Sequence, residues 1–269
     1  MADFRLREYL PDDVPALISL WCTCFDDTES FVRAFFSALP KIGSGIVAEC
    51  GGVPVSAAYT LNGQELVNGG KSRRVGYIYG VATDPRFRGM GIGGAVVRET
   101  AQLSKKLGAE IISTLPAEES LYQWYEDLIG VKKRLCREKI CTASKACVAV
   151  SEISTSEYAA KREMLLHEKA HLRLSPASVE FEGALLREYG GGFFSVSDGV
   201  AAAYIDGETA LIRELIGTNA CDYNKYAASV GAALGVSKAE LSVPSASGCS
   251  YIAADCELPA DCIWNLSFD

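Results

Sequence analysis

The pattern of hydrophobic and polar positions predicts a mixed order of strands and helices in the first half of the chain. Alternating apolar and charged residues predict strands, whereas apolar residues repeating every three or four positions predict helices. The longest strand ends at Asp84-Pro85, because proline cannot continue a β-ladder. The predicted strands are 4–9, 45–50, 53–61, 75–83, 110–115 and 135–141, and the predicted helices are 14–21, a stretch from about residue 30, 92–107 and 119–128.

Small and polar residues become frequent around 142–155, which predicts a junction there and two domains, 1–148 and 149–269. The second half repeats the element order of the first, which indicates a duplication of the fold. Its predicted helices are 157–172, 179–189 and 223–234; its predicted strands are 193–196, 200–205 and 209–216, with a β-like ending at 264–269.

Composition narrows the class of protein. The chain has 269 residues, 49% of them hydrophobic, which is ample for a packed core. A net charge of −8 argues against a nucleic-acid partner and leaves room for a cationic substrate. The first eight residues lack the apolar core of a signal peptide, and no apolar run reaches the ~18 residues of a membrane helix. We therefore expect a cytoplasmic protein without a membrane partner, whose ten cysteines are reduced thiols.

The most informative segment is Arg88-Gly89-Met90-Gly91-Ile92-Gly93-Gly94, between a strand and a helix. Glycines allow backbone N–H groups to approach a ligand, and a helix start presents unpaired donors and a positive dipole end. The segment therefore predicts a phosphate site. The spacing also fits the dinucleotide fingerprint, but five residues separate the strand from the first glycine and no acidic residue closes the next strand, which disfavours NAD.

Arg88-x-x-Gly91-x-Gly93, after the strand that ends at Thr83, resembles motif A of the GNAT N-acetyltransferase superfamily. Further segments, such as Trp21 to Asp27 and Pro116 to Tyr122, resemble an Eis-like group with a degenerate second GNAT-like half. The resemblance implies an α/β (α+β) fold with a mixed, mostly antiparallel sheet that splays at 75–83, followed by a smaller GNAT-like domain. It also implies that the loop and strand bind acetyl-CoA through Val81, Ala82, Thr83, Arg88, Gly89, Met90, Gly91, Ile92, Gly93 and Gly94.

In the family that the chain resembles, a tyrosine on the helix after the fifth strand protonates the departing thiolate. Tyr125 is the candidate here, although its spacing to Gly130 is five residues rather than the family's four. Asp26, Asp27 and Glu29 are tentative substrate-binding residues, since they border the acceptor cleft of such a fold; a solvated, helix-capping acidic cluster explains them slightly better.

His167-Glu168-Lys169-Ala170-His171 spells a zinc-peptidase pattern on a predicted helix. The chain has two histidines in all, so a third ligand would have to be a carboxylate or a cysteine. An amphipathic surface helix explains the residues more simply, and we expect no metal site.

The sequence thus predicts an acetyl-CoA-dependent N-acetyltransferase that acts by direct attack of a primary amine in a ternary complex. The acceptor is a small molecule or a peptide. The alternative is a non-catalytic acyl-CoA-binding or regulatory protein on the same scaffold. We expect the second half to bind no coenzyme and to form part of the acceptor pocket or a subunit interface, as in a homodimer.

Overall fold

The computed structural model describes residues 3–218, 220–245 and 250–264, so most of the β-like ending expected at 264–269 lies outside the described residues. The chain forms two compact units. The first comprises Met1–Leu66, Ser72–Arg134 and Ile252–Leu258, and the second comprises Val67–Lys71, Leu135–Tyr251 and Pro259–Asp269. The domain boundary at 148–149 stays a prediction about where the chain divides into independently folding parts.

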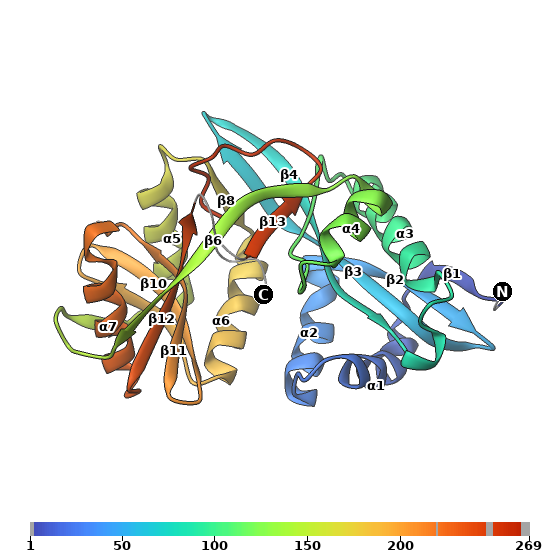
Figure 1. The fold of residues 1–269 in the computed structure, drawn as a ribbon, viewed down its shortest axis with the longest axis horizontal. Coiled ribbons are helices and arrows are strands. Elements are labelled where there is room, and N and C mark those ends of the chain that lie inside the picture. The colour runs from blue at the N-terminus through green and yellow to red at the C-terminus, as the bar shows by residue number, and fades with distance from the viewer. Residues whose placement is uncertain (1–2, 219, 246–249, 265–269) are drawn as a thin grey trace. The chain divides into compact units, whose positions relative to one another are not determined.

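The first unit is a layered α/β structure (Figure 1). Its strands follow the order β1-β2-β3-β4-β5-β13, in which β4 and β5 run parallel and the pairs β1–β2, β2–β3 and β5–β13 are antiparallel. The strands are β1 (Arg5–Glu8), β2 (Gly43–Cys50), β3 (Val53–Asn68), β4 (Lys71–Thr83), β5 (Ile111–Thr114) and β13 (Ser250–Ala254). The helices are α1 (Val14–Cys24), α2 (Glu29–Ile42), α3 (Ile92–Lys106) and α4 (Leu121–Ile129), with 3-10 turns η1 (Pro11–Asp13) and η2 (Pro85–Phe87).

Strands β4 and β5 separate after a short parallel pairing. Their register runs from Val75 opposite Ile111 to Tyr77 opposite Ser113, whereas β4 continues to Thr83. The predicted splay of the sheet at this strand is therefore confirmed. It leaves one edge of the second half of β4 without a β5 partner.

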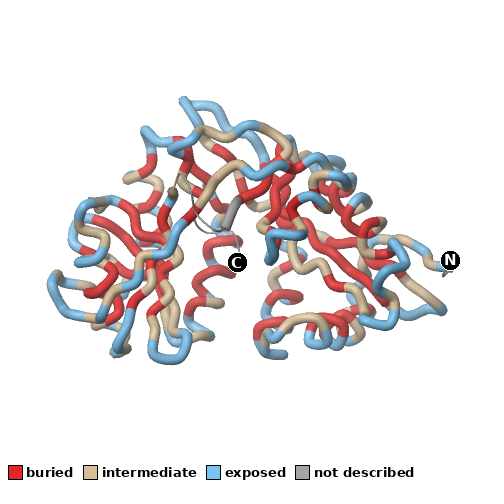
Figure 2. The backbone as a smooth tube through the Cα atoms, in the orientation of Figure 1, coloured by how far each residue is buried: buried red, intermediate tan, exposed pale blue. Residues whose placement is uncertain are grey.

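Two hydrophobic layers hold this sheet. Helices α1 and α2 cover one face, where Trp21, Phe35 and Tyr59 form the centre of a buried aromatic cluster. Helix α3 covers the other face, where Ile92 and Val96 are fully buried in a cluster of aliphatic side chains from β2 and β3. Burial of these apolar surfaces is the main stabilising term of the unit, and Figure 2 shows it concentrated along the strands and the inner sides of the helices.

The second unit repeats the strand order and directions of the first. Its sheet order is β6-β12-β11-β10-β9-β7, in which β11–β12 is the parallel pair and the other pairs are antiparallel. The strands are β6 (Lys132–Ala143), β7 (Val150–Glu152), β8 (His171–Leu174), β9 (Gly192–Val196), β10 (Gly199–Asp206), β11 (Thr209–Ile216) and β12 (Lys238–Ser245). The helices are α5 (Thr155–Leu166), α6 (Pro176–Glu188) and α7 (Tyr223–Ala233), with the 3-10 turn η3 (Ala220–Asp222).

The series β7-α5-α6-β9-β10-β11-α7-β12 corresponds to β1-α1-α2-β2-β3-β4-α3-β5, with β8 inserted between α5 and α6. Each unit therefore has a parallel strand pair, β4–β5 or β11–β12, joined by one crossover helix.

The predicted helix 157–172 is wrong at its C-terminal end. Helix α5 stops at Leu166, and His171 begins strand β8. Leu172 and Leu174 alternate with exposed Arg173, and this pattern of two overrides the helical pattern because the strand residues are buried. The two histidines of the zinc-peptidase pattern therefore do not share a helix face: His167 is exposed and His171 is buried.

Among the described residues, the helices are too short or too polar to cross a membrane.

Candidate active site

The glycine loop forms a helix start with unpaired donors. Gly89 and Gly91 have φ values of +75° and +78°, a backbone conformation that favours glycine. Gly91 caps α3, and its carbonyl accepts the first helical hydrogen bond, from the Ala95 N–H at 3.1 Å. The N–H groups of residues 92–94 therefore have no acceptor within the helix. A Cβ on Gly91 would meet no atom within 4 Å, so the space in front of these donors is open.

Neighbouring contacts hold the loop in this position. The Ile92 side chain is fully buried in the aliphatic cluster beneath α3, which fixes the first helical turn. A Cβ on Gly94 would lie 3.2 Å from the Leu128 side chain of α4, and one on Gly93 would lie 3.0 Å from the Thr83 hydroxyl. These two glycines thus allow α3 to approach α4 and the end of β4 closely.

Arg88 places a positive charge at the same end of β4. Its Nε donates to the Thr83 carbonyl at 3.1 Å, and its Nη2 lies 3.8 Å from the Cys24 sulfur. The Cys24 thiol also donates to the Thr83 carbonyl at 3.4 Å. The guanidinium is therefore held beside the glycine loop by contacts with the strand end and with α1.

Strand β4 reverses its alternation at Gly80. The Ile78 carbonyl accepts a hydrogen bond from the Thr114 hydroxyl of β5, whereas the Ala82 carbonyl and the Asp84 N–H bond to residues of β3. In a regular strand these evenly spaced groups would all face one way. Gly80, with φ +57°, supplies the irregularity. The backbone groups of Val81 consequently face the edge that β5 leaves open.

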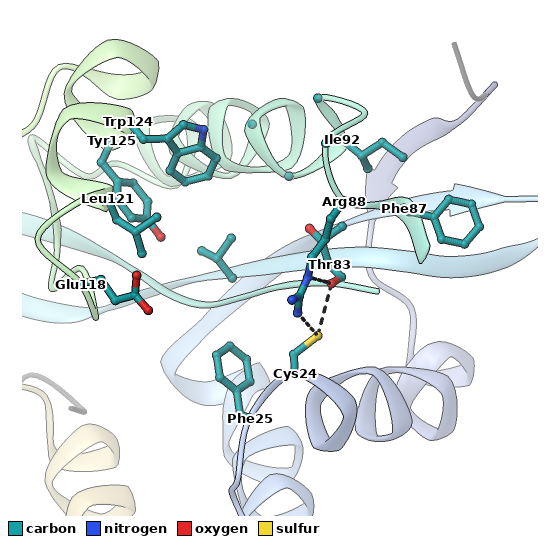
Figure 3. Close-up of a pocket in the computed structure, with 15 residues that line it drawn as sticks. Cys24, Phe25, Thr83, Phe87, Arg88, Ile92, Glu118, Leu121, Trp124 and Tyr125 are labelled. Carbon is teal, nitrogen blue, oxygen red and sulfur yellow. Dashed lines mark hydrogen bonds between the residues drawn. The ribbon is translucent and has the colours of Figure 1, made fainter. Parts of the chain in front are cut away.

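A pocket of about 580 Å³ connects these features, and Figure 3 shows its labelled side chains. Its lining includes most of the residues predicted to bind the coenzyme. Those residues are Val81, Thr83, Arg88, Gly89 and residues 91–94. Ala82 is buried, and Met90 is 49% exposed; neither is part of the lining.

Tyr125 lies in the wall of the pocket, although its spacing to Gly130 is five residues rather than four. It is 6% exposed, and its ring packs against Trp124 at 4.8 Å in a T-shaped arrangement. Burial raises the pKa of Tyr125 to about 12, while a hydrogen bond with the Thr114 side chain opposes the rise. Its hydroxyl is therefore a neutral donor at physiological pH. The extra residue is accommodated at the helix end, where Gly130 (φ +75°) caps α4.

The three acidic candidates lie outside the pocket lining: Glu29 is the first residue of α2, and Asp26 and Asp27 lie between α1 and α2. The Asp27 carboxylate accepts a 2.8 Å hydrogen bond from the Trp21 indole. Glu29 pairs with Arg33 one turn along α2 at 2.6 Å. Asp26 is exposed. The structure thus gives Asp27 and Glu29 local structural contacts, and their role in substrate binding stays a prediction.

Several lining residues were not predicted from the sequence. They are Cys24, Phe25, Phe87, Glu118, Leu121 and Trp124. Leu121 is one helical turn before Tyr125 on α4, and Trp124 is one turn after Leu121, so the spacing of that helix could have indicated both. Glu118 stands in the loop before α4, where no periodic pattern applies.

The corresponding opening of the second unit is filled by its own chain. Strands β11 and β12 pair only up to Ile212 and Leu241, and Arg213 is the extra residue of a bulge in β11. The buried guanidinium of Arg137 donates to the Arg213 carbonyl at 3.2 Å and to the Ser242 carbonyl at 3.3 Å. One side chain of β6 thus bridges the two diverging strands.

Comparisons with known proteins support the fold. Residues 5–126 match the family model of the acetyltransferase (GNAT) domain. A GCN5-related N-acetyltransferase from Kribbella flavida is 16% identical, with a TM-score of 0.68 over 94% of this chain and 70% of that chain. Another from Anabaena variabilis is 14% identical, with a TM-score of 0.65 over 94% and 72%. Eis1 from Mycobacterium abscessus is 13% identical, with a TM-score of 0.62 over 93% and 73%.

No curated protein gives a significant sequence match. At the identities above, the solved structures show a shared fold. Residues 5–126 therefore match a GNAT acetyltransferase domain, and the described chain shares the fold of these N-acetyltransferase structures.

Proposed function

We propose that this protein transfers an acetyl group from acetyl-CoA to a primary amine, and that its first unit carries the reaction. The observation that carries the proposal is the juxtaposition of open N–H donors at Gly91–Gly94, the Arg88 cation, the free edge of β4 and the Tyr125 hydroxyl around one pocket. The N–H donors and Arg88 match a diphosphate. The edge of β4 matches the amide-bearing pantetheine arm, and the Tyr125 hydroxyl matches a departing thiolate.

Residues 88–94 would hold the diphosphate, because helix N-termini and arginine both favour anions. The backbone of Val81 would pair with the pantetheine arm as an added strand pairs with a sheet edge. This places the thioester towards Tyr125, since the arm runs along β4 from the loop into the splay.

The amine nitrogen attacks the thioester carbonyl carbon, a C–N bond forms and the C–S bond breaks. The nitrogen releases one proton to water, and Tyr125 donates a proton to the departing sulfur and regains one from water. The products are an N-acetylamine and coenzyme A. A phenol with a pKa of about 12 is fully protonated at neutral pH, so Tyr125 carries the proton that a general acid must donate.

Binding of the coenzyme is tested by titration calorimetry with acetyl-CoA. Gly91→Glu places a carboxylate in front of the donors and should abolish binding. Gly235→Glu is the matched control, because Gly235 has a similar φ of +74° and open space around it but lies after α7. Equal binding by both variants would contradict the assignment of the loop.

Transfer is tested by thiol release with a panel of amines. Acetyl-CoA binding together with release that depends on the amine supports the enzyme. Binding without acetylation of any amine would favour the alternative, a non-catalytic acyl-CoA-binding protein on the same scaffold.

A further inference from the structure

The pocket carries opposite charges on opposite sides. Among its described lining residues, Arg88 supplies the cation and Glu118 supplies the carboxylate. Figure 3 shows Glu118 on the side of Leu121 and Tyr125, with its carboxylate turned towards the pocket interior, and Arg88 on the other side. The anionic coenzyme accounts for Arg88. The Glu118 carboxylate, on the side of Tyr125, is not explained by an anionic coenzyme and instead suits a cationic ligand.

Glu118 differs from its neighbour in the chain. Glu119 forms an ion pair with Lys133 and does not line the pocket. The Glu118 carboxylate accepts one long hydrogen bond, from the Ser120 hydroxyl at 3.4 Å, and no ion pair of Glu118 occurs among the described residues. Its carboxylate is thus available to a cation that enters the pocket.

The wall next to Glu118 is apolar. Leu121 and Phe25 line the pocket there, and Phe25 extends from the aromatic cluster with its ring 5.4 Å from that of Trp21. Asp27 holds the Trp21 indole from the opposite direction, which fixes the ring against which Phe25 packs. This wall offers ring and methyl surfaces rather than hydrogen-bond partners.

We propose that the acceptor is a primary amine that is cationic at neutral pH and carries an apolar or aromatic body, and that Glu118 binds its ammonium group. This inference rests on the proposed acetyl transfer and names the substrate class of the same pocket. Phe25 and Leu121 contact the body of the amine. An amine with a carboxylate beside the nitrogen is disfavoured, because that carboxylate would face Glu118. A polyhydroxylated amine is disfavoured because its hydroxyls would lose water without gaining partners.

The test compares three amines of similar size: 2-phenylethylamine, phenylalanine and glucosamine. With the wild-type protein, thiol release should give a kcat/KM for 2-phenylethylamine that exceeds the other two by about tenfold or more. Glu118→Gln should raise the KM for 2-phenylethylamine by about tenfold while leaving the KM for acetyl-CoA unchanged, since the lost ion pair is with the acceptor. Glu119→Gln is the matched control and should change neither constant.

An unchanged KM in Glu118→Gln, or a preference for glucosamine or phenylalanine, would overturn the proposal. If acetyl-CoA binds but no amine is acetylated, the transfer function fails, and the acceptor site is tested directly. Tryptophan fluorescence, to which Trp124 in the pocket wall contributes, then reports binding of 2-phenylethylamine to the complex with coenzyme A. Binding that Glu118→Gln weakens and Glu119→Gln does not weaken would support the site, whereas absent or unaffected binding would refute it.

Discussion

Gly80 of strand β4 lies directly against Trp21 of helix α1: a Cβ on Gly80 would be 2.7 Å from the indole ring. The same residue has φ +57° and reverses the alternation of β4 beside the proposed coenzyme edge. The buried aromatic cluster and the open strand edge therefore depend on one glycine.

Gly80→Ala should destabilise the protein by about 2–5 kcal/mol, because a left-handed alanine is strained and its methyl group overlaps the buried ring. Urea unfolding measures this. Gly51→Ala is the control, since Gly51 has a nearly identical φ of +59° but no atom near the added methyl. It should lose only about 1–2 kcal/mol. Equal losses in the two variants would show that contact with Trp21 is unimportant.

Tyr125→Phe should lower kcat by about 100-fold or more, because it removes the general acid. Affinity for acetyl-CoA should stay within twofold, as the ring remains. Tyr122→Phe on the same helix is the control; Tyr122 is also buried but does not line the pocket, so its kcat should not change. A Tyr125→Phe variant with wild-type kcat would exclude Tyr125 as the acid.

The rate should rise with pH and show no fall up to about pH 10. The acceptor must lose a proton to attack, and alkylamines resemble lysine with a pKa of roughly 10.4. Tyr125, whose pKa burial raises to about 12, keeps its proton throughout this range. The profile of kcat/KM for wild type and Tyr125→Phe is the measurement. A falling limb between pH 8 and 10 that disappears in Tyr125→Phe would contradict the assigned state.

Arg137→Met should destabilise the second unit by about 2–4 kcal/mol, since two carbonyls of the diverging strands lose a charged donor. Calorimetric titration should still find one acetyl-CoA per chain, because no glycine-rich loop precedes α7 and the acidic residue Asp222 is its N-cap. A second bound coenzyme in this variant would mean that Arg137 blocks a working site.

Glu163 should stabilise the second unit above about pH 4.5 and lose this effect towards pH 2. Although burial opposes it, hydrogen bonds from His171 and Arg173 and the charge of Arg162 lower the pKa of Glu163 from 4.5 to about 2. The folded state therefore holds the ionised form, and protonation at low pH removes the advantage. Unfolding of wild type and Glu163→Gln should differ at pH 6 and converge near pH 2. A constant difference would show that the ionised form is not favoured by folding.

The local pattern determined most of the elements and the backbone conformation of the glycine loop. The four glycines after Arg88 predicted a helix start with unpaired N–H donors, because such donors and positive φ values depend on only a few consecutive residues. The splay at 75–83 was implied by the resemblance to a family, and the order of strands within the sheet was not predicted from the sequence. The boundaries of α3 and β11 needed little correction.

Tertiary packing decided what the chain pattern could not. Residues 167–172 continue a helical pattern in the sequence. In the structure they form a turn followed by the start of β8, because Leu172 and Leu174 are buried as strand residues. In the sequence, Arg137 is one of several charged residues in an alternating strand. In the structure its guanidinium is buried and donates to the carbonyls of Arg213 and Ser242, which are far from it along the chain. Glu118 and Glu119 are equivalent in sequence, and only the direction of each side chain separates a pocket carboxylate from a surface ion pair. Periodicity reports which face of an element is apolar, whereas contacts between distant segments determine the partner of each polar group.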